Sequence, residues 1–275
     1  MSESDFQLKL TYIFKTKEEY FDFIIMQSKC EKLRLKKLMK KELYKRRIEL
    51  LYEKKRLNYY IMYIIYNIMD FTILNKTIAL VAKRNSGKSV LLKYLVEQEE
   101  HYKKIFVICP TKFNGFYDNW IEPNCIFEDY DEEWTEKLIS KMSKINQGKT
   151  NDTADHILLI LDDCCSDTKF HASKSIKKLF SRGRHSFISI IITCQMLHHI
   201  PPILRCNSDF LIIGQLNAEN LNSLSDEFRI GLDKKDFIKM YKRLTTDYSF
   251  LIINNNSLKD SDDLNLLYGA IKAKI

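Results

Sequence analysis

The segment at residues 82–89, which reads AKRNSGKS, constrains the fold of this chain more than any other feature. An apolar run precedes it at residues 77–81, and an aliphatic pattern with helical spacing follows it from Val90. A strand, a tight loop ending in Gly-Lys-Ser and a helix form the context in which backbone N–H groups bind a polyphosphate. We therefore expect a phosphate-binding loop made of Ala82, Lys83, Arg84, Asn85, Ser86, Gly87, Lys88, Ser89 and Val90.

Two side chains of this loop have expected roles in binding ATP. Lys88 would reach the β- and γ-phosphates, and the Ser89 hydroxyl would bind Mg²⁺. The motif usually begins with glycine, whereas this chain has Ala82 there. Alanine carries a Cβ, so the backbone at Ala82 must avoid positive φ. The alternative is a chance match in a lysine-rich chain, and structural context decides between the two.

A second candidate strand, at residues 156–161, ends in Asp162 and Asp163. Its unbroken aliphatic run is typical of a strand buried on both faces of a parallel sheet. Ligands of open α/β sheets bind at the carboxyl ends of the strands, where these two carboxylates would lie. Asp162 is then a candidate Mg²⁺ ligand, and Asp163 a candidate for orienting or deprotonating the attacking water.

A third strand pattern, at residues 186–193, is followed by Gln195, whose amide could contact the γ-phosphate or position water. Arg182 and Arg184 flank a glycine just before this strand. A guanidinium can neutralise charge in the transition state, so both are candidate arginine fingers, with Arg205 as a third choice. Solvated surface arginines are the alternative.

Two longer stretches, GRHSFISIIITCQ at residues 183–195 and PPILRCNSD at residues 201–209, follow the phosphate loop and the paired carboxylates in this order. Together the motifs resemble the viral genome-packaging ATPases of the FtsK–HerA superfamily. The resemblance is to the poxvirus-type branch of large DNA viruses, virophages and Polinton-like elements, and it covers about residues 71–253. Two residues depart from the family pattern. Ala82 replaces the usual first glycine of the loop, and Asp163 stands where many relatives in the wider superfamily carry glutamate.

The resemblance implies a homo-oligomeric ring, a pentamer or hexamer, that hydrolyses ATP to push double-stranded DNA into a preformed capsid. Its implied partners are DNA, further copies of the chain and a capsid vertex or portal protein. Two other functions remain open. One is a HerA-like helicase or DNA pump, and the other is a nucleotide-gated assembly or membrane adaptor whose ATP site acts only as a switch.

Strand patterns alternate with helical patterns of ten or more residues, which predicts an α/β fold with a mostly parallel sheet and helices on both faces. We expect an N-terminal helical region at residues 1–69 and a P-loop ATPase domain at residues 70–275. Strands are expected at residues 71–74 and 248–253 among others, and a short helix at the C-terminus.

The net charge of +8 is concentrated near the N-terminus, because residues 29–56 contain 13 basic and 4 acidic residues. The apolar residues of this segment are spaced more like those of a helix than those of a strand. This segment could contact DNA phosphates, an acidic portal or anionic lipid, or could be a solvated helical face. The candidate DNA-binding residues are Lys36, Lys37, Lys40, Lys41, Arg46 and Arg47.

Localisation is expected to be intracellular, and the resemblance implies the host cytoplasm at a viral factory, the virion, or both. The 7 cysteines are odd in number and include no C-x-x-C pair, and the chain has no secretory start. The Tyr- and Ile-rich run at residues 59–66 is shorter than the roughly 20 residues that a membrane span needs. We therefore expect no transmembrane segment, and at most a peripheral membrane contact.

Overall fold

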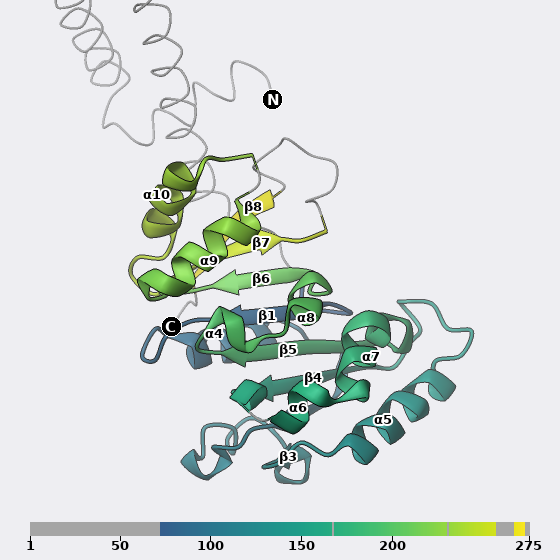
Figure 1. Ribbon diagram of the computed structural model, residues 1–275. Helices are drawn as coiled ribbons and strands as arrows, with labels where there is room; N and C mark the ends of the chain where they lie inside the picture. The colour runs from purple at the N-terminus through teal and green to yellow at the C-terminus, as the bar shows by residue number, and fades with distance from the viewer. Residues whose placement is uncertain (1–71, 167, 230, 257–266, 273–275) are drawn as a thin grey trace, which may run out of the picture. The chain divides into compact units, whose positions relative to one another are not determined.

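The computed structural model describes residues 72–166, 168–229, 231–256 and 267–272. The basic N-terminal segment, with its candidate DNA-binding residues and the domain boundary expected near residue 70, therefore lies outside the described residues. Figure 1 shows the elements of the described part.

An eight-stranded sheet organises these residues, with strand order β3-β2-β4-β5-β1-β6-β7-β8. Every neighbouring pair from β3 to β6 is parallel, whereas β7 and β8 continue the sheet antiparallel. This arrangement confirms the predicted fold class. The strands are β1 Thr77–Val81, β2 Tyr102–Ile108, β3 Ile126–Phe127, β4 His156–Asp162, β5 Ile188–Cys194, β6 Phe210–Ile213, β7 Ser249–Asn254 and β8 Tyr268–Lys272.

The three central strands are buried along their whole length because their sequences are apolar on both faces. All of β1 and β5 is buried, and so is β4 up to its last residue, Asp162. A strand covered by helices on both faces has no solvent side, so it needs no alternation of polar residues. The first polar carboxylate of β4 consequently appears where the strand leaves the core.

Helices cover both faces of the sheet (Figure 1). On one face, Leu91, Leu92 and Leu95 of α4 join a core cluster with Ile160 and Ile212. In Figure 1, α5, α7 and α9 lie in front of the sheet, on the opposite face. The helices are α4 Lys88–Glu97, α5 Glu132–Ile145, α6 Thr168–Ala172, α7 Lys174–Arg182, α8 Pro202–Cys206, α9 Ala218–Phe228 and α10 Lys234–Leu244.

Four of these helices begin at a residue whose side chain accepts a hydrogen bond from a backbone N–H in the first turn. The capping residues are Asp131, Ser173, Asn217 and Asp233, before α5, α7, α9 and α10. Such caps satisfy N–H groups that have no partner inside the helix. They fix the first turns of α5, α7, α9 and α10 at these residues.

Two predicted elements are wrong. Residues 72–76 form a turn rather than a strand, with Lys76 N–H bonded to the Ile73 carbonyl, and Ile73 is buried as a single apolar contact. The segment expected to be a C-terminal helix contains β8 instead. Pairing with β7 satisfies the backbone of β8, and Tyr268 is buried there with its hydroxyl on the Phe228 carbonyl.

Candidate functional site

The phosphate-loop sequence forms the tight turn between β1 and α4 that the motif predicts. Gly87 has φ +83° and lies immediately before the first residue of α4, and Asn85 is also left-handed at φ +57°. The Ser86 hydroxyl donates to the Lys83 carbonyl at 2.6 Å, which closes the turn. The first N–H groups of α4 therefore point out of the helix start, where an anion can accept their hydrogen bonds.

Ala82 fits at the start of the loop because the chain has a glycine opposite it. Its backbone is not among the positive-φ positions, as predicted, and the residue is fully buried. A Cβ placed on Gly214, the residue after β6, would come within 2.8 Å of the Ala82 Cβ. Gly214 thus leaves the space that the Ala82 methyl group occupies.

The structure places Asp162 at the carboxyl end of β4 with hydroxyl and thiol neighbours. Its Oδ1 accepts a short hydrogen bond from Thr193 Oγ1, and Cys109 Sγ lies 3.5 Å from its Oδ2. Burial raises the pKa of the Cys109 thiol, so the group stays neutral beside the carboxylate. Neither neighbour carries a positive charge, so the carboxylate can bind a cation.

Tyr117 also belongs to this corner of the site. Its ring is buried, and its hydroxyl has no hydrogen-bond partner within the described residues. Burial, followed by the charge of Asp162, raises the pKa of Tyr117 far above its usual value. A neutral phenol therefore lies next to the candidate metal ligand.

Asp163 and Gln195 are brought together, as expected for residues at the ends of adjacent strands. Gln195 Nε2 donates to Asp163 Oδ2 at 2.8 Å. The backbone of Asp163 is left-handed at φ +56°, and its N–H contacts both the carbonyl and the hydroxyl of Thr193. Aspartate tolerates this conformation better than most residues, so the turn aims the side chain away from the strand direction.

The register of the sheet relates the carboxylates to the phosphate loop. Asp162 on β4 is paired with Thr193 on β5, and Thr193 is paired with Leu80 on β1. Neighbouring strands lie about 4.8 Å apart, so the backbone at Asp162 is about 10 Å from β1 across a single strand. Loop, paired carboxylates and Gln195 consequently share one edge of the sheet.

The candidate arginine fingers Arg182 and Arg184 lie away from the phosphate loop of their own chain. Arg184 is in the 3₁₀ turn that precedes β5, at the edge of the sheet opposite the phosphate loop, and Arg182 is exposed at the end of α7. Arg184 Nη1 lies 3.3 Å from the buried Asp209 carboxylate, while 53% of its side chain is exposed. The structure does not bring Arg182 or Arg184 to the phosphate loop of the same chain.

Arg205 is held inside its own chain. It forms an ion pair with Glu227 at 2.9 Å, and its Nη1 donates to the Ile200 carbonyl at 2.5 Å. Only 12% of its side chain is exposed. These contacts give Arg205 a structural role in fixing the segment between β5 and β6.

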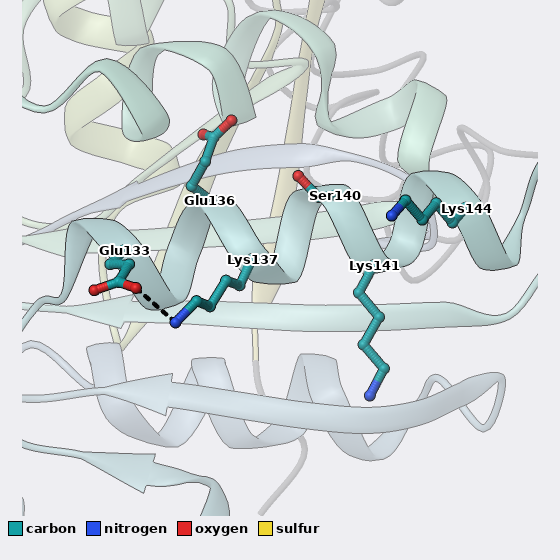
Figure 2. Close-up of a pocket in the computed structure, with 6 residues that line it drawn as sticks. All are labelled: Glu133, Glu136, Lys137, Ser140, Lys141 and Lys144. Carbon is teal, nitrogen blue, oxygen red and sulfur yellow. Dashed lines mark ion pairs between the residues drawn. The ribbon is translucent and has the colours of Figure 1, made fainter.

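Two cavities differ in their relation to the site. Figure 2 shows one of about 460 Å³ along α5, whose lining residues, among them the Glu133–Lys137 ion pair, come from that helix alone. It contains no candidate site residue. The other, of about 480 Å³, lies beside the phosphate loop and is lined by Lys83, Gln215 and Thr245, among others.

Sequence reasoning did not identify Thr193, Cys109, Tyr117 or Gly214 as parts of the site. No motif marks Cys109, Tyr117 or Gly214. Thr193 lies within the stretch at residues 183–195, but only the register of adjacent strands shows that it is paired with Asp162. Within the described residues, no helix is both long and apolar enough to cross a membrane.

Comparisons with known proteins agree with this geometry. A family model described as "Poxvirus A32 protein" matches residues 67–265. Protein 075L of Invertebrate iridescent virus 6, which has no assigned function, is 30% identical over 190 residues, covering 68% of this chain and 73% of that protein. The DNA packaging protein OPG160 of vaccinia virus (strain Copenhagen) is 28% identical over 167 residues, covering 58% of this chain and 61% of that protein.

Solved structures share the fold. The DNA-packaging ATPase B204 from Sulfolobus turreted icosahedral virus superposes with a TM-score of 0.52 at 17% identity, covering 74% of this chain and all of that chain. At this identity the likeness concerns the fold. The family match spans the phosphate loop, both strands that carry the candidate catalytic residues and the sheet beyond them. By sequence, this chain belongs to the poxvirus A32 protein family.

Proposed function

We propose that this protein is an ATP-driven motor that packages a viral double-stranded DNA genome into a preformed capsid. One observation carries the proposal: the phosphate loop, Asp162, Asp163 and Gln195 share one sheet edge in a member of this family. A relative is named a DNA packaging protein, and a protein of the same fold is a packaging NTPase in complex with AMPPCP.

Nucleotide binding would begin at the start of α4. The N–H groups around Gly87 would bind the phosphates, and Lys88 would neutralise charge on the β- and γ-phosphates. Ser89 is exposed, and the Asp162 carboxylate faces a hydroxyl and a thiol rather than a cation, so these two oxygen ligands would hold Mg²⁺. Bound there, the metal would supply neutralisation of phosphate charge.

Hydrolysis would depend on Asp163. Gln195 holds its Oδ2 in a hydrogen bond, which leaves Oδ1 without a hydrogen-bond partner among the described residues. In the proposed mechanism, that oxygen would accept a proton from a water attacking the γ-phosphate. Gln195 would then be a positioning residue that fixes the direction of the carboxylate.

Assembly would complete the site. Arg184 and Arg182 lie at the far edge of the sheet, so either could reach a phosphate loop only in a neighbouring copy of the chain. We therefore assign the arginine finger in trans, within a homo-oligomeric ring around DNA. The basic N-terminal region, residues 1–69, would contact DNA phosphates or the capsid vertex, in a viral factory or virion.

The purified full-length chain tests this function in two measurements. ATP hydrolysis is assayed with and without linear duplex DNA, and the particle mass is determined with Mg-ATP present. We expect turnover that duplex DNA stimulates and a mass that corresponds to a closed ring. Tight ATP binding with weak turnover that DNA leaves unchanged would contradict the proposal and indicate a nucleotide-gated adaptor.

A further inference from the structure

Tyr248 is an exposed aromatic residue in an unusual backbone conformation. It lies in the turn between α10 and β7, and 59% of its surface is accessible. Its φ is +58°, and the preceding Asp247 has φ +52°. Bulky side chains rarely adopt positive φ, because the Cβ then crowds the following carbonyl. Such a conformation costs free energy, and it persists only where the surroundings impose it.

The surroundings of this turn do impose it. Ser249 N–H bonds to the Thr246 carbonyl at 2.9 Å, which closes the turn just before β7. Asp247 forms an ion pair with Lys272 of β8 at 2.5 Å. The turn is thus attached to both antiparallel strands at this edge of the sheet, and the Tyr248 side chain is presented in a fixed place.

The Tyr248 side chain lies against the phosphate loop. A Cβ built on Gly87 would lie 3.1 Å from Tyr248 Cδ1 and 3.7 Å from its Cβ. The tyrosine side chain therefore packs against the glycine that begins α4. Gly87 needs to be glycine for this contact as well as for its positive φ.

The order of the strands determines which end of a nucleotide would meet Tyr248. Gln195 follows β5, which neighbours β1 on one side, and Asp162 and Asp163 lie beyond it at the end of β4. β7, which Tyr248 precedes, lies on the other side, across β6. If the γ-phosphate faces the carboxylates, the nucleoside leaves the loop on the side away from them. Tyr248 is then the exposed aromatic ring on that side of the loop.

We propose that Tyr248 forms a stacking platform for the base of the bound nucleoside triphosphate. This inference rests on the proposed function, because it takes the phosphate loop to bind ATP. The contact between an aromatic ring and a base is worth a roughly 5- to 150-fold change in affinity when the ring is removed. If stacking on the base is what the ring contributes, removing the ring weakens binding of ATP and leaves binding of a polyphosphate without a base unchanged.

The test measures equilibrium binding of Mg-ATP and of magnesium tripolyphosphate, the same anion without a nucleoside, to the full-length protein. Tyr248→Ala is expected to weaken ATP binding roughly 5- to 150-fold and to leave tripolyphosphate binding unchanged. Tyr248→Phe, which keeps the ring, is expected to bind both like the wild type. Phe113→Ala is the matched control, because Phe113 is 83% exposed and follows β2, which β4 and β5 separate from β1.

Three results would overturn the proposal, and they differ from one another. Equal losses for ATP and tripolyphosphate in Tyr248→Ala would mean that the ring only supports Gly87. Unchanged binding of both ligands would mean that the ring contributes to the binding of neither the phosphates nor the base. A wild-type protein that binds neither ligand would instead contradict the proposed function itself. Thermal unfolding of each variant establishes that the fold is retained in every comparison.

Discussion

The two sides of the phosphate-binding edge are organised differently. On the β4–β5 side, the Asp162 carboxylate has a hydrogen-bonded partner on β5, Thr193, and the Asp163 carboxylate has one immediately after β5, Gln195. On the β1–α4 side, Lys83, Arg84, Asn85 and Ser89 are exposed. The carboxylates are therefore oriented by partners within the fold, whereas these loop side chains face solvent. This contrast suggests that the loop determines binding and that the carboxylate side determines turnover.

Lys88→Ala should have the largest effect and tests the loop side directly. Loss of the ammonium group leaves the charge of the β- and γ-phosphates without neutralisation, so ATP turnover should be abolished. Steady-state ATP hydrolysis measures it. Lys93→Ala, in the same helix and in an exposed pair with Glu97, is the matched control and should be silent. Near wild-type hydrolysis in Lys88→Ala would refute the phosphate-loop assignment.

Substitutions of Arg184 test whether a neighbouring subunit completes the ATP site. Arg184→Ala should lower turnover by roughly 10³-fold, and mixing it with Lys88→Ala subunits should restore part of the activity, since each supplies what the other lacks. Specific activity should also rise with protein concentration. Because Arg184→Ala leaves Asp209 without its ion pair, Arg184→Lys serves as a second variant that keeps the charge but not the planar fork.

The ring interpretation would be wrong under either of two results. One is full activity of the wild-type chain as a dilute monomer. The other is normal turnover in Arg184→Ala, Arg182→Ala and Arg205→Ala alike. Unfolding measurements on each variant separate a lost finger from a lost fold.

The carboxylate side predicts a division of roles between neighbouring residues. Asp163→Asn should keep Mg-ATP binding and lose about 10²- to 10⁴-fold in hydrolysis, the usual contribution of a general base. Asp162→Asn should instead weaken Mg²⁺-dependent ATP binding. Magnesium titrations of ATP binding and of turnover distinguish the two. Identical defects in both variants would show that the roles are not divided.

The smallest expected effect tests how the loop is packed. Gly214→Ala would place a methyl group 2.6 Å from Phe250 Cε1 and 2.8 Å from the Ala82 Cβ. Such overpacking should lower the free energy of unfolding by about 1–3 kcal/mol, measured by urea denaturation. Adding Ala82→Gly removes one of the two close contacts and should recover part of the loss. No recovery would mean that the Ala82 contact is not the cause.

The sequence predicted most of the sheet because β1, β4 and β5 have apolar runs that few other structures accommodate. It did not predict β8, whose residues 268–272 become a strand only through pairing with β7. The strand predicted at residues 71–74 was wrong for the opposite reason. Ile73 is a single buried aliphatic residue in a turn, and in the local sequence it looks like part of a strand. Non-local contacts decided both cases, and a local pattern does not contain them.

The residues of the candidate site show the same limit of local sequence patterns. Lys88, Ser89, Asp162 and Asp163 belong to contiguous motifs with a known chemical role, so sequence identified them as candidates. Thr193, Gly214 and Tyr248 reach the site through strand register and a strained turn. Gly214 and Tyr248 contribute through the residues that they pack against, and nothing in their own sequence segments marks them.

Thr193 gives the site an unusual dependence on a single hydrogen atom. Its hydroxyl accepts the Asp163 N–H, so its one proton is free to point only at Asp162, as it does. Valine has nearly the same shape but neither function, so it would remove the side-chain partner of Asp162 on β5 and leave Asp163 with the Thr193 carbonyl and Gln195. One hydroxyl at this position therefore contacts both members of the carboxylate pair, whereas an isosteric side chain without the hydroxyl would loosen Asp162 more than Asp163.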